Sequence, residues 1–193
     1  GVNPFRLINM PVEPLVASWN GEYETRGKLS DADCVIGLSF GYRGEGKNVT
    51  PGLSNQDLAN VAFKQFANLP KILQFEIADA YSQLDAHDSN KVIRIEKHRK
   101  RGKYLDTREV VEQAKIVMDA NGWSKPVLLA HPYHMPRVQL VCDKLGIDWI
   151  ATDASVGQIE FDPLSTQKWT RDLDHWRGYE PLAMAFYGLK GWV

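Results

Sequence analysis

Two hydrophobic patterns alternate along most of the chain. Short apolar runs, one of them alternating with charged residues, are typical of β-strands and occur at 33–41, 71–78, 91–98, 125–131 and 148–154. Apolar residues at helical spacing occur at 54–69, 106–122, 135–146 and from about residue 170. This alternation predicts an α/β fold in which a mostly parallel five-stranded sheet carries helices on both faces.

The first 32 residues lack this pattern. They contain three prolines and a polar stretch, so we expect residues 1–32 to form an irregular N-terminal lead-in. Residues 33–193 then form a single domain, which ends in an aromatic-rich C-terminal helix with an interruption near Pro181. The clearest helix is that at 106–122, where Asp106 and Glu109 have the spacing of a capping box.

Charge and cysteine content narrow the class of protein. The 193 residues include 23 Lys and Arg against 24 Asp and Glu, so no net field favours nucleic acid or a membrane surface. No apolar stretch reaches the roughly 18 residues of a membrane span. Cys34 and Cys142 each lie in an apolar run, and we expect both to be reduced core residues, which favours a cytoplasmic location. The chain begins with Gly, which leaves open an upstream signal or anchor, and a homo-oligomer also stays open.

The segment HPYHMPR at 131–137 carries the most chemistry. Ligands of parallel sheets bind beyond the carboxyl ends of the strands, and this segment directly follows one strand. Its first proline ends the strand and its second fits a first helical turn, so we expect a strand–turn–helix elbow. Tyr133 and His134 would lie in the turn, and Arg137 would join the helix N-terminus in binding an anion. Alternatively, Arg137 pairs with a carboxylate from a neighbouring loop.

Histidine chemistry at the elbow has three interpretations. His134 is a candidate general acid–base or oxyanion donor, or a side chain bonded only to loop backbone. A metal site through His131 and His134 is disfavoured, because the prolines exclude a regular helix and no third ligand lies nearby in the sequence. We therefore predict no metal ligands at the elbow.

A basic loop, KHRKRGK at 97–103, follows the third strand. Such a run of charge is most often a solvated surface. The functional alternative is a phosphate clamp over the site, in which His98 binds the ligand and Gly102 is the pivot.

Two further strand ends carry candidate residues. SFGYRGEG at 39–46 offers Gly41 and Arg43 to an anion, although it is not a dinucleotide-binding signature. The second strand ends in FEIADAY, which places Glu76 and Asp79 near the same edge of the sheet. They are a candidate base, a Mg²⁺ pair, or partners for the arginines at 43 and 137.

Three segments, in chain order, resemble a known family. VIGLSFG at 35–41, DTRE at 106–109 and YHMPR at 133–137 are similar to motifs of the domain-of-unknown-function 218 family, over roughly residues 33–152. The resemblance implies a Rossmann-like three-layer α/β/α sandwich with a cleft at the carboxyl ends of the strands. Members are mostly uncharacterised; some are linked to cell-envelope maintenance, and one is associated with S-adenosylmethionine binding. The site positions that match the family motifs are Thr107, Glu109, Tyr133, His134 and Arg137 and, loosely, Gly37 and Gly41.

The chain also departs from the family pattern. Gln74, Phe75 and Glu76 stand where the family usually has Ser-Gly-Gly, and Asp106 replaces an Asn. Loss of glycines restricts the approach of backbone to a phosphate, so we expect a different ligand or reduced activity.

These observations together predict a small-molecule-binding protein, an enzyme acting on a phosphorylated or nucleotide-like ligand. S-adenosylmethionine, a nucleotide or Mg²⁺ stay open as cofactors. The alternatives are a non-enzymatic accessory protein in cell-envelope maintenance, which binds a partner through the cleft or the aromatic tail, and an S-adenosylmethionine-binding protein. The expected catalytic residues are His134, Glu76 and Asp106, and the expected ligand-binding residues are Gly41, Arg43, His98, Thr107, Tyr133 and Arg137.

Overall fold

The computed structural model describes residues 11–84, 92–153 and 159–193. The protein is α/β, with a four-stranded sheet in the order β3-β2-β1-β4 whose neighbouring strands all pair in parallel. The strands are β1 (Cys34–Gly37), β2 (Lys71–Gln74), β3 (Val92–Ile95) and β4 (Pro126–Leu129). The helices are α2 (Val12–Asn20), α3 (Leu53–Gln65), α4 (Phe75–Leu84), α5 (Thr107–Asn121), α6 (Met135–Lys144) and α7 (Leu173–Leu189).

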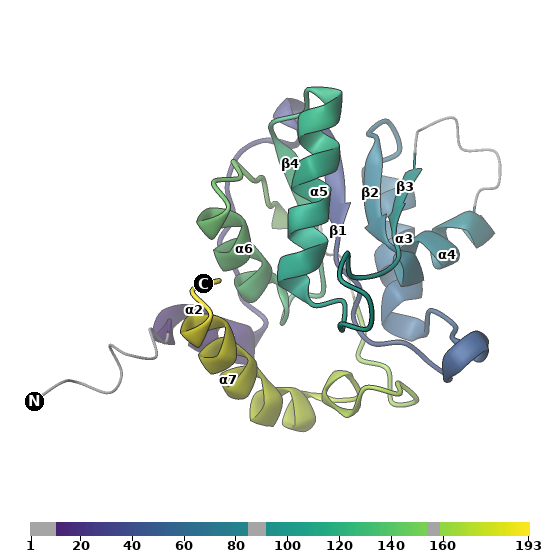
Figure 1. The fold of residues 1–193 in the computed structure, drawn as a ribbon, viewed down its shortest axis with the longest axis vertical. Coiled ribbons are helices and arrows are strands. Elements are labelled where there is room, and N and C mark those ends of the chain that lie inside the picture. The colour runs from purple at the N-terminus through teal and green to yellow at the C-terminus, as the bar shows by residue number, and fades with distance from the viewer. Residues whose placement is uncertain (1–10, 85–91, 154–158) are drawn as a thin grey trace, which may run out of the picture.

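Two hydrophobic cores lie on opposite faces of the sheet. Successive side chains of a strand point to opposite faces, so Ile36 of β1 belongs to a core with α5 and α6, and its neighbour Val35 belongs to a core with α3 and α4. All four residues of β1 are buried, as expected for a strand covered on both faces. The ribbon shows the resulting layers, with α5 and α6 on one side of the sheet and α3 and α4 on the other (Figure 1). This arrangement is compatible with a Rossmann-like sandwich.

Within the described ranges the sheet has four strands, and the prediction of five was wrong. The run at 148–154 makes a single parallel bridge, in which Ile150 pairs with Val127. The next residue turns away to the N-terminal segment, because Ala151 forms an antiparallel bridge with Arg26 through hydrogen bonds of 2.9 and 3.0 Å. Because the run divides its backbone N–H and C=O groups between β4 and Arg26, it cannot extend along β4.

The second strand is shorter than the apolar run that predicted it. β2 ends at Gln74, and α4 begins at the next residue and buries Ile77, Ala78 and Tyr81. The run at 71–78 therefore joins the end of a strand to the first turn of a helix. A short apolar run has no period that separates these two structures.

The lead-in predicted to be irregular contains α2. Pro14 lies in the first turn of this helix, where a missing N–H costs no hydrogen bond, and Gly21 ends it in the left-handed conformation at φ 66°. The helix packs on α6 and α7, and Trp176 donates from Nε1 to Ser18 at 3.2 Å. Residues 11–32 thus contribute to the support of α7.

The last helix is continuous. α7 begins after Asp172, whose carboxylate accepts the backbone N–H of His175 at 2.8 Å, and it runs through Pro181 without the predicted interruption. Cys34 and Cys142 are buried and unpaired, as expected. None of the helices in the described ranges is both long and apolar enough to cross a membrane.

Candidate functional site

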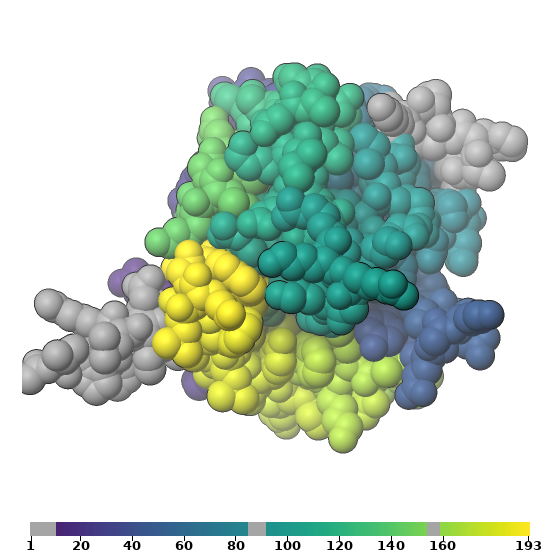
Figure 2. All heavy atoms as spheres, viewed as in Figure 1, coloured from purple at the N-terminus to yellow at the C-terminus, as the bar shows by residue number. Residues whose placement is uncertain are grey.

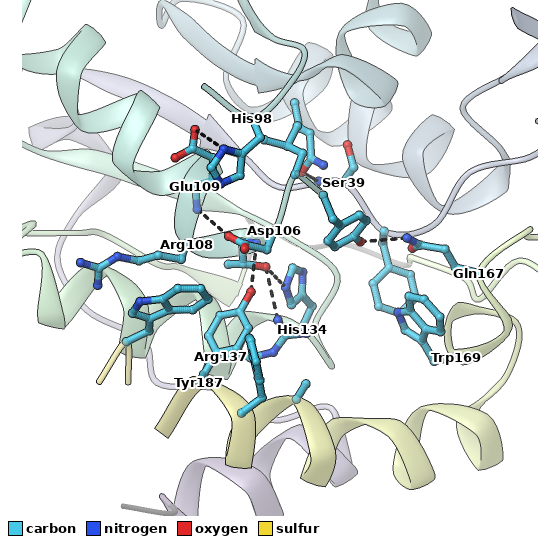
Figure 3. A pocket seen from close by; sticks show the side chains of 18 of the residues that line it. Ser39, His98, Asp106, Arg108, Glu109, His134, Arg137, Gln167, Trp169 and Tyr187 are labelled. Carbon is cyan, nitrogen blue, oxygen red and sulfur yellow. Dashed lines mark hydrogen bonds and ion pairs between the residues drawn. The ribbon is translucent and has the colours of Figure 1, made fainter. Parts of the chain in front are cut away.

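A pocket of about 860 Å³ opens at the carboxyl ends of the strands. Its floor includes Ser39 and Gly41 after β1 and Gln74 at the end of β2. The elbow that follows β4 contributes His134, and α7 and the basic loop form the walls (Figure 3). β1 lies between β2 and β4, so the strand order reverses here, and such a reversal is the usual ligand position in open α/β sheets.

The nine sequence-predicted site residues divide into two groups. The residues that line the pocket are Gly41, His98, Asp106, Thr107, His134 and Arg137. Those that do not line it are Arg43, Glu76 and Tyr133. The structure therefore brings six of the nine candidates to one cavity.

Thr107 is at the centre of the pocket floor. As the first residue of α5, it has a backbone N–H without an intrahelical acceptor, and this N–H donates to the Tyr187 hydroxyl at 3.1 Å. Its Oγ1 lies 2.9 Å from Nε2 of His134 and receives a longer, 3.4 Å hydrogen bond from Nη1 of Arg137 (Figure 3). Because Arg137 can only donate, the Thr107 hydroxyl accepts its bond, and toward His134 the hydroxyl donates or accepts according to the tautomer of the imidazole.

Arg137 pairs with a carboxylate within the protein. Its Nε donates to Glu180 of α7 at 2.7 Å, and the two side chains are only 6% and 0% exposed. Burial opposes the charge, but the Glu180 carboxylate raises the pKa of Arg137, so the guanidinium stays protonated. The carboxylate alternative is the arrangement observed, although the partner comes from helix α7 and not from a neighbouring loop.

His134 is neutral. Burial lowers its pKa well below the usual value, and the nearby charge of Arg137 and the neighbouring His131 lower it further. A neutral imidazole next to a fixed cation favours the hydrogen-bonding interpretation of His134 over that of a cationic acid.

The other elbow histidine is a core residue. The His131 ring stacks on Phe40 at a centroid distance of 3.9 Å, and burial lowers its pKa to about 3. No group of three His, Cys, Asp or Glu side chains within the described ranges could hold a metal ion.

The basic loop is anchored by ion pairs of Arg99, whereas the lysines that follow have no such pairs within the described ranges. The Arg99 guanidinium pairs with Glu109 at 2.9 Å and with Glu112 at 2.6 Å. Lys100 and Lys103 line the pocket, and neither forms an ion pair with any carboxylate in the part of the chain that the structure describes. Lys190, directly after α7, also lines the pocket and forms no ion pair within the described ranges; its Nζ lies 5.6 Å from the centre of the Phe186 ring. Lys100 and Lys103 are thus the available positive charges that the basic loop brings to the pocket wall.

The expected capping box forms only in part. The Asp106 carboxylate accepts the backbone N–H of Glu109 at 2.8 Å, as an N-cap should. The Glu109 carboxylate instead accepts the backbone N–H of Arg99 at 2.9 Å as well as its guanidinium. Burial alone would raise the pKa of Glu109, but the bonds from Arg99 outweigh it and lower the pKa to about 2. Glu109 therefore anchors the basic loop to α5.

Arg43 and its loop have a structural role. Arg43 forms two hydrogen bonds of 2.8 and 2.7 Å with the buried carboxylate of Asp162, which also caps the N-terminus of α3 at Leu53. A side chain at Gly41 would meet Oγ1 of Thr170 at 2.4 Å, so this glycine permits the close approach of the 162–170 segment. The anion loop predicted at 39–46 is occupied by the protein itself.

The other two candidates lie outside the pocket. The Tyr133 ring lies against Gly21 and 5.2 Å from the ring of Phe161. Glu76 is buried in the first turn of α4, and its Oε1 has no hydrogen-bond partner within the described ranges. Asp79, its expected companion, instead pairs with Arg94 at 2.7 Å.

One wall of the pocket was not predicted from the sequence. It is formed by aromatic side chains of α7 and of the short 3₁₀ helix before it, Lys168–Thr170, together with Trp192 after α7, Tyr104 and Gln167. The members of this wall from residue 169 onward are Trp169, Trp176, Tyr179, Phe186, Tyr187 and Trp192. The density of aromatic residues in the tail was the available signal, but it is equally typical of a helix that covers a core.

Comparison with protein-family models, with curated proteins and with solved structures gave no match.

Proposed function

We propose that this protein binds a small anionic ligand, phosphorylated or nucleotide-like, in the pocket at the carboxyl ends of its strands. The observation that carries the proposal is the pair Lys100 and Lys103, which line the pocket and have no ion-pair partner among the described residues. In a pocket of about 860 Å³, these two unbalanced ammonium groups, together with that of Lys190 after α7, favour an anion. Arg137, the first candidate from the sequence, is already balanced by Glu180.

The pocket floor supports chemistry on such a ligand. Thr107 and the neutral His134 offer hydrogen-bonding groups within 2.9 Å of each other, next to the fixed charge of Arg137. We propose that these groups bind and polarise the reacting part of the ligand, with Asp106 holding the N-terminus of α5 in place. His134 then acts through hydrogen bonds and does not carry a positive charge.

An adenosyl cofactor fits this pocket less well. Sites for such cofactors in doubly wound sheets commonly use an acidic residue near the end of the second strand to bind the ribose hydroxyls. Glu76 is in that region of the sequence, but it is buried outside the pocket lining. The residues present therefore do not fit the common mode of binding S-adenosylmethionine.

The family assignment is part of the proposal. The elbow forms the expected turn and helix and brings His134 and Arg137 to the pocket, which supports membership of the domain-of-unknown-function 218 family. The strand order supports a Rossmann-like sandwich with a four-stranded sheet.

A thermal-shift and calorimetric screen tests the anion site. Its members are phosphate, pyrophosphate, sugar phosphates, nucleotides and S-adenosylmethionine, each with and without Mg²⁺. Ligand at a hundred times its dissociation constant adds about 2.7 kcal/mol of stability, which for this size corresponds to roughly 5–10 °C. The shift should vanish in Lys100→Ala/Lys103→Ala and persist in the control Lys47→Ala/Lys64→Ala, whose lysines do not line the pocket. No shift with any anion would contradict the proposal.

One observation favours the accessory-protein alternative. α7 exposes Leu182, Phe186 and Leu189, which lie on one side of the helix at spacings of three and four residues. Exposed apolar stripes of this kind can bind a partner. Light scattering of the protein and of Leu189→Lys, which changes a residue outside the pocket, would detect self-association through this stripe.

A further inference from the structure

The aromatic wall of the pocket contains a stacked pair of rings. The rings of Trp169 and Tyr179 lie 4.5 Å apart at an interplanar angle of 12°, and both line the pocket. We call this pair the aromatic platform. Both residues are half-buried, unlike Trp176, whose ring centre lies 6.2 Å from that of Tyr179 and which is 1% exposed. Core rings are normally enclosed on all sides, whereas the platform keeps part of its surface for the cavity.

The platform is held in place by its own segment. Thr170, next to Trp169, donates from Oγ1 to Ser165 at 2.7 Å, and its backbone carbonyl accepts the N–H of Asp162 at 3.2 Å. Asp162 is in turn fixed by Arg43. Trp169 is therefore presented by an anchored turn, and a ligand that stacks on it need not order that turn.

The platform adjoins the basic loop. Gln167 donates from Nε2 to the Tyr104 hydroxyl at 2.9 Å, which joins the segment before Trp169 to the residue after Lys103 (Figure 3). The space-filling view shows the teal loop lying directly against the yellow and yellow-green C-terminal part of the chain (Figure 2). A flat apolar surface and two available ammonium groups thus belong to the walls of one cavity.

We infer that the ligand is a nucleotide-class molecule, in which a planar heteroaromatic ring stacks on Trp169 and a phosphate group binds Lys100 and Lys103. The inference rests on the proposed anion site and extends it. The cavity of about 860 Å³ is of a size that encloses drug-sized ligands, which leaves most of it empty around a lone phosphate. A platform of parallel rings selects a flat partner over an aliphatic one, and stacking tolerates any base because every base has a π-face.

The test compares ligands with the same phosphate content. Isothermal titration measures the binding of the four common nucleoside diphosphates and of pyrophosphate to the wild-type protein. We expect at least one nucleoside diphosphate to bind about tenfold or more tightly than pyrophosphate, which corresponds to about 1.4 kcal/mol and lies within the range of one stacked base.

Variants separate the two halves of the ligand. Trp169→Leu should lose the tenfold preference, whereas Trp169→Phe should keep most of it, and Trp123→Phe, outside the pocket, is the matched control. Lys100→Ala/Lys103→Ala should weaken nucleoside diphosphates and pyrophosphate alike. Unfolding curves recorded for each variant show whether it is folded, and the Phe variant provides the comparison if the Leu variant is not.

The two proposals fail in different ways. If pyrophosphate binds as tightly as every nucleoside diphosphate, and Trp169→Leu changes neither, the stacking inference is wrong and the anion site stands. If none of these compounds binds, both the inference and the anion site are wrong.

Discussion

The elbow and the basic loop bring positive charge to the same pocket in opposite ways. Arg137 of the elbow is buried and bonded to Glu180 and Thr107, so its charge is balanced and its position fixed. Lys100 and Lys103 of the basic loop are exposed and have no carboxylate partner in the described part of the chain. The more conspicuous sequence motif thus builds the floor of the site, and the plainer charge run supplies the charge that a ligand can use.

The largest expected effect comes from removing the counter-charge at the elbow. Glu180→Gln keeps the shape of the side chain but leaves the Arg137 charge buried, so we expect a loss of about 3–5 kcal/mol in the free energy of unfolding. Urea unfolding measures it. Replacing both partners, as in Arg137→Met/Glu180→Leu, should recover most of the loss, because the apolar pair buries no charge. A small effect of Glu180→Gln would show that the elbow charge is not balanced as the structure indicates.

Glu76 sharpens the comparison, since it is a buried carboxyl with no cation bonded to it. Burial raises its pKa from 4.5 to about 7, so the folded state holds the proton more tightly than the unfolded chain. Its contribution is fully present below pH 4.5 and is lost as the pH rises toward 7, by about 3 kcal/mol in all. Glu76→Gln cannot ionise. The stability of this variant relative to wild type should therefore increase from pH 4 to pH 8. Equal differences at the two pH values would contradict the raised pKa.

His131 gives the opposite dependence on pH. Its pKa falls from 6.5 to about 3 on folding, so the neutral form contributes stability that is present above pH 6.5 and is lost as the pH falls toward 3. At two pH units below 6.5, the loss in the free energy of unfolding is about 2.7 kcal/mol. In His131→Asn, whose amide oxygen can still accept the Tyr133 N–H, the loss of stability between pH 6.5 and pH 4.5 should be smaller by about this amount. An unchanged slope in urea unfolding at the two pH values would contradict burial of a neutral ring.

The sequence predicted the layers of the fold and the edge that holds the pocket. Strand and helix patterns placed β1, β3, β4, α3, α5, α6 and α7, because their hydrophobic periods are clear. The sequence patterns did not predict the start of α4, where one apolar run passes from strand to helix. They also did not predict that the run at 148–154 forms no full strand, which depends on a bridge to Arg26. Both errors arise from contacts or boundaries that a local pattern does not contain.

The site was predicted in part for a similar reason. The elbow and the caps of α5 are local motifs, so Thr107 and His134 could be placed from their own surroundings. The partners of Arg43 and Arg137 are Asp162 and Glu180, which lie 119 and 43 residues further along the chain. No pattern in the sequence indicates which distant carboxylate balances which arginine.

The smallest effect on stability, and the most direct test of the comparison, comes from the basic loop. Because Lys100 and Lys103 are exposed and lack ion-pair partners in the described ranges, Lys100→Ala/Lys103→Ala should change the free energy of unfolding by no more than about 0.5 kcal/mol. The same change should weaken pyrophosphate binding, and most strongly at low salt, since exposed charges are screened at high ionic strength. Loss of binding with retained stability would identify the loop as the part of the pocket devoted to ligand. If instead the variant loses stability and binding together, the lysines belong to the same structural network as Arg137, and the distinction between the two regions is wrong.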